Sequence, residues 1–362
     1  MNLISTHRFG GKILLFVAAF WLAACSDDDV NPVTPPAAQE GYFIINEGGF
    51  GNANTSLSFY DRSRDTVLNN VFENANGRPL GDQAQSMTVF DTLAFVVVQN
   101  SAKIEVIDPS DFTSIATIID GITSPRYLLG LNNTKAYVTD WGADGITGTV
   151  KVIDLNTYQV TQTIPVGQGP NQLVLWEGRV YVANGGGYGR DSTLMVIDPA
   201  TDAVVDTVVV GDNPSSLVVD AENDLWVAGG GYISYAEDFS VVEEESTPGF
   251  LAELKGGAVS QRLDAARIGV GPSDVTANLR DAALCFQYQD GVYTMPSTAT
   301  AWPDQPLIDQ RFYGVAIDPV SGEILTGEAP NFSAEGTFHR YASTGELIKS
   351  YTVGIAPNGF AF

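Results

Sequence analysis

Val106-Ile107-Asp108, Val152-Ile153-Asp154 and Val196-Ile197-Asp198 are three copies of the tripeptide that decides the fold of this 362-residue chain. The copies lie about 45 residues apart, and each is followed by a turn and another β-rich run. A second marker, a proline turn leading into an apolar strand, keeps phase with the first. It occurs as Ser124-Pro125-Arg126, Gly169-Pro170-Asn171, Asn213-Pro214-Ser215, Gly271-Pro272-Ser273 and Ala356-Pro357-Asn358. This period is typical of propeller blades.

Each repeat contains four short strands, because another strand, such as Val180-Tyr181-Val182, lies between the two markers. Counting from the proline turns gives six blades, over residues 85–119, 126–166, 171–210, 215–270, 274–308 and 313–353. Residues 357–362 form an innermost strand without a blade, and residues 41–72 form a blade without its innermost strand. We therefore predict an all-β, seven-bladed β-propeller that is closed by pairing of the C-terminal strand with the N-terminal blade. Strand signals are weakest in 274–308.

Two features of the repeats have simple structural explanations. The repeated Asp108, Asp154 and Asp198 are expected to accept hydrogen bonds from turn amides, as a carboxylate after a strand commonly does. Cys285 lies in an apolar stretch and is expected to be a buried thiol without a partner. We therefore expect no catalytic role for these aspartates or for Cys285.

Composition excludes several classes of function. The net charge is -25, with 43 acidic against 18 basic residues, and no basic stripe is present that could neutralise phosphates. The chain is therefore not expected to bind nucleic acid. It has only two cysteines and two histidines, which are too few for a disulfide framework, a thiolate zinc site or a multi-histidine metal site.

The N-terminal residues indicate export. Arg8 and Lys12 precede an apolar run, 13–24, which has the length of a signal-peptide core and is short for a membrane span. The run ends in Leu22-Ala23-Ala24-Cys25, which resembles the lipobox of bacterial lipoproteins. We expect residues 1–24 to be a lipoprotein signal peptide and Cys25 to carry the lipid. The alternative is an ordinary secretory signal with a chance cysteine.

Residues 25–40 are predicted to be a lipidated tether, and residues 41–362 the propeller. Ser26-Asp27-Asp28-Asp29 resembles the acidic signal of Bacteroidetes lipoproteins that are sent to the outer face of the outer membrane. The stretch that follows, up to residue 40, is rich in Pro and Ala and has no apolar periodicity. We expect the protein to be lipid-anchored in the outer membrane and exposed at the cell surface.

One face of the propeller carries the candidate binding residues. The loops between the second and third strands of five blades combine glycine or proline with an aromatic side chain. Glycine lets backbone approach a ligand closely, and an aromatic residue on such a loop has little core to fill, so the set suggests a platform for a large, partly flat ligand. The alternative for any single aromatic side chain is that it caps the hydrophobic ends of neighbouring blades. The candidates are Phe50, Trp141, Tyr188, Tyr232 and Phe332.

The blade-to-blade loops open on the same face and add further candidates. These loops contain Arg78, Arg126, Tyr127, Arg311, Phe312 and Tyr313. An arginine there could bind a phosphate or carbonyl oxygens, or it could pair with one of the many acidic side chains. The sequence leaves both possibilities open.

Catalysis has little support in the sequence. His339 is the one histidine beyond the predicted signal peptide, and no base and nucleophile recur at positions that would meet on one face. Calcium sites built on Asp140 and Asp144, or on Glu243-Glu244-Glu245, lack EF-hand spacing. We expect a protein that is not an enzyme, with no metal site and no required cofactor. Quinone-dependent dehydrogenases also use propellers, an analogy of fold alone.

Five segments carry a resemblance to a known family: Ile45-Asn46-Glu47-Gly48, Asn76-Gly77-Arg78-Pro79-Leu80-Gly81-Asp82, Ala84-Gln85-Ser86-Met87, Lys103-Ile104-Glu105-Val106-Ile107-Asp108 and Thr123-Ser124-Pro125-Arg126-Tyr127. They resemble the YncE-like, YVTN-repeat propeller lipoproteins of Bacteroidetes. The resemblance covers residues 41–362 and is strongest before about Val227. Within that family the BtuG type captures cobalamin at the cell surface and passes it to a TonB-dependent outer-membrane transporter.

The resemblance implies a surface lipoprotein that binds cobalamin or a related corrinoid and hands it to such a transporter. A corrinoid is a large ring with amide arms and a phosphate, which suits aromatic loops, backbone amides and a few arginines. No side-chain ligand to its cobalt is expected. One alternative is a scaffold or adhesion propeller that binds a polypeptide or glycan at the same rim. A metal-assisted, lactonase-like enzyme is a further alternative.

Overall fold

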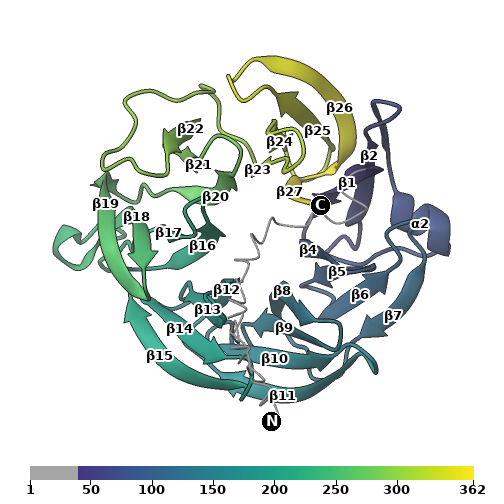
Figure 1. Cartoon of the computed structure of the whole chain (residues 1–362), viewed down its shortest axis with the longest axis horizontal. Coiled ribbons are helices and arrows are strands. Elements are labelled where there is room, and N and C mark those ends of the chain that lie inside the picture. Colours follow the sequence, from purple (N-terminus) through teal and green to yellow (C-terminus); the bar gives the residue numbers. More distant parts are fainter. Residues whose placement is uncertain (1–39) are drawn as a thin grey trace, which may run out of the picture. The chain divides into compact units, whose positions relative to one another are not determined.

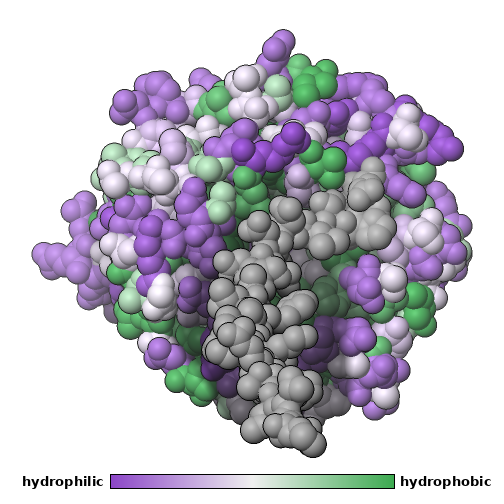
Figure 2. Space-filling view, in the orientation of Figure 1, coloured by the Kyte–Doolittle hydropathy of each residue, from purple (hydrophilic) through white to green (hydrophobic). Residues whose placement is uncertain are grey.

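A computed structural model describes residues 40–362, which form seven antiparallel sheets arranged around a common axis (Figure 1). The predicted signal peptide, Cys25 and almost all of the tether lie outside the described residues. Strand β1 begins at Gly41, where the propeller was expected to start. The predicted all-β, seven-bladed β-propeller is confirmed. Figure 2 shows a mostly hydrophilic surface with scattered hydrophobic patches.

The first four sheets, from the innermost strand outward, are β27 (Pro357–Ala361), β1 (Gly41–Asn46), β2 (Ser56–Asp61) and β3 (Thr66–Leu68); β4 (Ala84–Phe90), β5 (Leu93–Val98), β6 (Lys103–Ile107) and β7 (Ser114–Ile118); β8 (Pro125–Asn132), β9 (Lys135–Asp140), β10 (Thr149–Asp154) and β11 (Gln159–Pro165); and β12 (Pro170–Trp176), β13 (Arg179–Asn184), β14 (Thr193–Asp198) and β15 (Ala203–Val209).

The other three sheets are β16 (Pro214–Val219), β17 (Leu225–Gly229), β18 (Pro248–Lys255) and β19 (Ala258–Ile268); β20 (Ser273–Asn278), β21 (Ala283–Tyr288) and β22 (Gly291–Pro296); and β23 (Gly314–Ile317), β24 (Ile324–Glu328), β25 (Glu335–Tyr341) and β26 (Leu347–Ile355). Within residues 41–362, two short helices lie in connecting segments: α2 (Val71–Asn76) and the 3₁₀ helix η1 (Glu243–Glu245).

The expectation of four strands in every repeat is wrong for one blade. The sheet of β20, β21 and β22 has three strands, and its outermost position holds only an isolated bridge between Val292 and Ile308. This is the blade whose strand signals are weakest. Pro303 and Pro306, in the segment that follows β22, cannot donate ladder hydrogen bonds, which disfavours a full fourth strand there.

Apolar side chains pack between neighbouring sheets. Within residues 40–362 they form seven buried clusters, and each joins two adjacent blades around the ring. The repeated Asp108, Asp154 and Asp198 accept turn amide N–H groups at 2.7–2.9 Å, as expected. Cys285 is a buried free thiol, also as expected, and burial raises its pKa to about 12.

The ring closes through the two ends of the described chain. Strand β27 pairs with β1, with Phe43 opposite Ala361 and Ile44 opposite Phe360. The sheet of β27, β1, β2 and β3 is therefore built from both ends of the described chain, and the innermost edge of β1 is covered as predicted.

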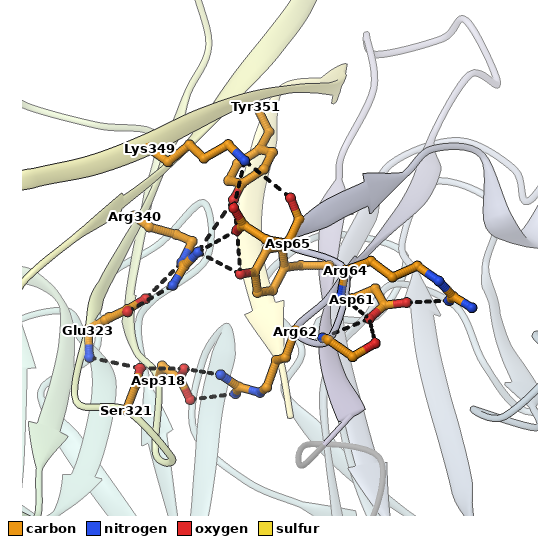
Figure 3. Close-up of polar contacts among 12 residues, drawn as sticks. Asp61, Arg62, Arg64, Asp65, Asp318, Ser321, Glu323, Arg340, Lys349 and Tyr351 are labelled. Atoms are coloured by element: carbon orange, nitrogen blue, oxygen red, sulfur yellow. Dashed lines mark hydrogen bonds and ion pairs between the residues drawn. The ribbon is translucent and has the colours of Figure 1, made fainter.

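A network of charged side chains supports this closure between β2–β3 and the last blade (Figure 3). Asp65 accepts hydrogen bonds from Arg340 at 2.8 Å, Lys349 at 2.6 Å and Tyr60 at 2.9 Å, and from Tyr351. These partners hold the pKa of Asp65 well below its usual range, the Lys349 ammonium most of all. The carboxylate form is thus stabilised in the folded ring.

We predict that Asp65→Asn lowers the free energy of unfolding by about 1–2 kcal/mol, since hydrogen bonds between charged groups are lost from a partly exposed site. Because the folded-state pKa is depressed, the contribution of Asp65 is present above about pH 4 and fades as the pH falls below it. Urea unfolding at pH 7 and pH 3 measures both effects. Asp304→Asn, at an exposed loop position, is the matched control and should change neither value; an equal loss in the control would contradict the assignment.

Candidate functional site

A polar pocket of about 410 Å³ lies at the centre of the ring, at the end where the innermost strands begin. Every blade except that of β16–β19 contributes to it, since the pocket gathers residues at strand starts and in the loops between second and third strands. It is lined by Glu47, Gln83, Gln85, Gln99, Arg126, Tyr127, Trp141, Tyr188, Asp274, Tyr313 and Asn358.

Arg126, at the start of β8, is the one cationic residue that lines the pocket. Its guanidinium carbon lies 4.1 Å from the centre of the Trp141 ring, and one of its terminal nitrogens donates a 2.5 Å hydrogen bond to Gln99. Its Nε is buried and has no hydrogen-bond partner among the described residues. Burial lowers the pKa of Arg126. The pocket thus holds a positioned guanidinium that makes no ion pair with a described residue.

Two aromatic rings form one wall of the pocket. Trp141 follows β9 and donates from its indole to the Pro170 carbonyl at 3.0 Å. Tyr188 meets it edge to face, with the ring centres 5.9 Å apart, and is 80% exposed. The Tyr188 ring lies against Gly145, where an added Cβ would come within 2.3 Å of it and where φ is +70°. Glycine at 145 therefore allows the tyrosine to stand at the rim.

Two carboxylates face the same space. Glu47 accepts hydrogen bonds from Gln83 at 3.1 Å and from the Tyr313 hydroxyl, and Asp274 accepts from Gln287 at 2.6 Å. Burial raises the pKa of both Glu47 and Asp274. Burying a charged ligand group among them is costly, whereas amide and hydroxyl groups can use the donors and acceptors of the lining side chains.

Four of the predicted ligand-binding residues meet at the pocket: Arg126, Tyr127, Trp141 and Tyr188. Tyr127 accepts a 3.2 Å hydrogen bond from Gln85. Phe50 and Phe332 do not line it, although both are exposed on loops of the same face. Phe332 packs edge to face on Tyr313, a pocket residue, at 5.4 Å.

The other three predicted residues lie elsewhere. Arg78 pairs with Glu105 at 2.5 Å, so for this arginine the ion-pair alternative describes the contact. Tyr232 lies under the guanidinium of Arg190, at 4.3 Å, in the long loop after β17. Arg311 donates to the Gln289 carbonyl at 2.8 Å and does not line the pocket.

Sequence reasoning missed most of the polar lining. Gln85, Asp274 and Asn358 occupy the start of an innermost strand, next to the proline turns or their equivalent, as Arg126 does. In a ring of blades the first residues of the innermost strands converge on the central axis. The position of a residue directly after a proline turn could therefore have identified these lining residues from the sequence. The remaining residues that were missed are Glu47, Gln83 and Gln99, whereas Tyr313, which the sequence placed in a blade-to-blade loop of this face, does line the pocket.

Acidic groups outside the pocket have local partners. Asp140 accepts the amides of Thr123 and Ser124, and Asp144 caps its own turn through Thr147, so both suggested calcium ligands are turn formers. In the described part of the chain, one acidic trio could hold a cation: Asp220, Asp224 and Glu253. Lys255 already pairs with two of its members, at 2.8 and 3.3 Å.

The sequence did not show that the remaining histidine has a hydroxyl and a carboxylate as neighbours. In the last blade His339 lies 2.7 Å from the Ser350 hydroxyl and 3.0 Å from the Glu328 carboxylate. This trio lies outside the pocket lining.

Comparison with known proteins places the chain in a family. Residues 40–261 match a domain of unknown function, DUF5074. The chain belongs to the DUF5074 family. No curated protein matches it. No helix in residues 40–362 is long and apolar enough to cross a membrane.

Solved structures share the fold of this DUF5074 protein. A candidate 6-phosphogluconolactonase from Bacteroides fragilis is similar at 12% identity and TM-score 0.62, covering 90% of this chain and 99% of that one. A quinonprotein alcohol dehydrogenase-like protein from Bacteroides thetaiotaomicron is similar at 14% identity and TM-score 0.59, covering 90% and 78%. Hydrazine synthase from Kuenenia stuttgartiensis is similar at 17% identity and TM-score 0.58, covering 83% and 90%. At these identities the likeness concerns the fold alone.

We predict that Glu47→Gln flattens the pH dependence of stability. Because the folded-state pKa of Glu47 is raised, the native protein holds its proton above the pH at which the unfolded chain releases it, about 4.3. Wild-type stability should therefore fall, relative to the variant, between pH 4 and pH 7. Urea unfolding at these two pH values measures it, and Glu335→Gln, at an exposed position, serves as control. A parallel pH dependence in wild type and variant would show that Glu47 titrates normally.

Proposed function

We propose that this DUF5074 protein is a surface-exposed lipoprotein that captures cobalamin or a related corrinoid and passes it to a TonB-dependent outer-membrane transporter. In this proposal the capture function is not enzymatic and needs no cofactor of its own, and Cys25 anchors the protein in the outer membrane through a lipid. The resemblance to YncE-like lipoproteins and their BtuG type motivates the choice of ligand and partner.

The observation that carries the proposal is the combination of Arg126, Trp141 and Tyr188 with side-chain amides in one central pocket. Corrinoid amide arms both donate and accept hydrogen bonds, which matches a lining of Gln and Asn residues. A corrinoid is larger than about 410 Å³, so in this proposal one edge of the ring enters the pocket. The exposed Tyr188 would then contact the part that remains outside.

A scaffold or adhesion role is the second candidate, and one observation favours it. The loop after β17 carries Phe239, 85% exposed, and Tyr235, 58% exposed, on the same face as the pocket. Aromatic side chains of this kind are enriched where polypeptides or glycans bind. A lactonase-like activity rests on likeness of fold alone.

A binding experiment separates these functions. A soluble form that begins at Ser26 is mixed with excess cyanocobalamin, desalted and examined for corrinoid absorbance, and its melting curve is recorded with and without ligand. Capture predicts retained colour and a raised melting temperature, because a ligand that binds the native state stabilises it. A colourless protein with an unmoved melt would overturn corrinoid capture and favour a macromolecular partner.

We predict that Tyr188→Ala weakens cyanocobalamin binding about tenfold, since one exposed aromatic contact is worth roughly 1–1.5 kcal/mol. Isothermal titration calorimetry measures the dissociation constant. Tyr235→Ala removes an exposed tyrosine that does not line the pocket, and this variant should bind as the wild type does. Equal weakening in both variants would show that the pocket wall is not the contact.

The lipid anchor gives a separate prediction. Cys25→Ala removes the thiol that would carry the lipid, so the protein should move from the membrane fraction to the soluble fraction when the full-length chain is expressed in a bacterium with lipoprotein processing. Immunoblotting of the two fractions measures this, with Cys285→Ala as control. Membrane retention of Cys25→Ala would refute the anchor.

A further inference from the structure

Three polar side chains of the last blade form a connected line across β24, β25 and β26. Register places His339 opposite Ser350, and Glu328 is diagonal to His339 on the neighbouring strand. Successive side chains of a strand alternate between faces, and these three share one face. His339 Nδ1 lies 2.7 Å from Ser350 Oγ, and Nε2 lies 3.0 Å from Glu328.

The contacts of the neutral imidazole define its tautomer. The Glu328 carboxylate can only accept a hydrogen bond, so Nε2 carries the proton and Nδ1 is left as an acceptor for the Ser350 hydroxyl. The ring of Phe312 packs near the imidazole, 5.8 Å between centres, and the histidine side chain is 13% exposed. The imidazole of His339 therefore faces the Ser350 hydroxyl, and Glu328 orients the imidazole. This arrangement is the general signature of an activated nucleophile.

Ser350 is open to solvent. It lies on β26, the outermost strand of its blade. Its face of the sheet is directed away from Arg340 and Lys349, which reach towards Asp65 of the first blade (Figure 3). The blade on the side of Phe312 has only three strands, so no outermost strand stands beside β26 there.

We propose that Ser350 is a nucleophile activated by His339, with Glu328 as the orienting group, and that the site accepts acyl groups from carboxylic esters. Ser350 Oγ attacks the carbonyl carbon and forms a C–O bond while its proton passes to His339 Nδ1. The bond to the leaving oxygen breaks, and His339 returns the proton to it. Water then attacks the acyl-serine by the same route, which releases the carboxylic acid and restores Ser350.

The rate that this arrangement can support is modest. A positioned general base contributes about 10²- to 10⁴-fold, and the loss of one oxyanion-hole donor costs about 10²- to 10³-fold in enzymes that have one. The polar contacts of the trio include no backbone N–H group. We therefore expect hydrolysis of esters with good leaving groups, at roughly 10²-fold above the same protein without the serine hydroxyl.

The test uses the soluble form that begins at Ser26. An alkyl fluorophosphonate probe, which phosphonylates activated serines, should label Ser350 in the wild type, located by peptide mass spectrometry. p-Nitrophenyl acetate hydrolysis, followed by p-nitrophenolate absorbance, should fall about 10²-fold in Ser350→Ala and in His339→Gln, and less in Glu328→Gln, which keeps an acceptor for Nε2.

Ser343→Ala is the matched control, because Ser343 is an exposed serine in the β25–β26 turn of the same blade. It should keep both labelling and hydrolysis. The proposal is overturned if the probe labels no serine or another serine in the wild-type protein, or if Ser350→Ala hydrolyses the ester as fast as the control. Labelling of wild-type protein does not depend on how the variants fold. Neither readout involves the central pocket, so the result is independent of corrinoid capture.

Discussion

The pairing of β27 with β1 is the contact on which the rest of the structure depends. It turns seven separate sheets into a closed ring, because the innermost strand of one blade comes from the opposite end of the chain. The central pocket depends on it directly. Glu47 follows β1 and Asn358 lies on β27, so two pocket residues come together only when the ring has closed. A ligand held in the pocket would therefore also stabilise the closure.

The ion pairs explain why closure does not rest on backbone pairing alone. Arg340 binds Glu323 through two nitrogens, at 2.8 and 2.9 Å, and also reaches Asp65 in the first blade. Arg62 forms a similar pair with Asp318 across the same boundary. In a chain of net charge -25, these cations neutralise carboxylates where the two ends meet. Arg62 and Arg340 are therefore not candidates for ligand binding, because both already pair with carboxylates of the protein.

Arg126 differs from these arginines, and the difference explains what the sequence could and could not predict. The repeat markers predicted all seven blades and the closing strand, since a fixed period with proline turns constrains the register strongly. Whether an arginine in a blade-to-blade loop pairs with an acid was not predictable, because the partner comes from a distant part of the sequence. Arg78 meets Glu105, whereas Arg126 stacks on Trp141 and makes no ion pair with a described residue. Weak strand signals in residues 274–308 marked the blade that has three strands, but they did not show which strand is missing.

Alternation along two adjacent strands separates the chemistry of the last blade into two faces. On β25, Arg340 points to the closure and His339 points away from it; on β26, Lys349 and Tyr351 reach Asp65 while Ser350 meets His339. A one-residue shift of register would exchange the two sets and break both. The closure ion pairs therefore fix the register that brings His339 to Ser350. Sequence spacing alone did not show this juxtaposition, since His339 and Ser350 meet only once β25 and β26 are paired.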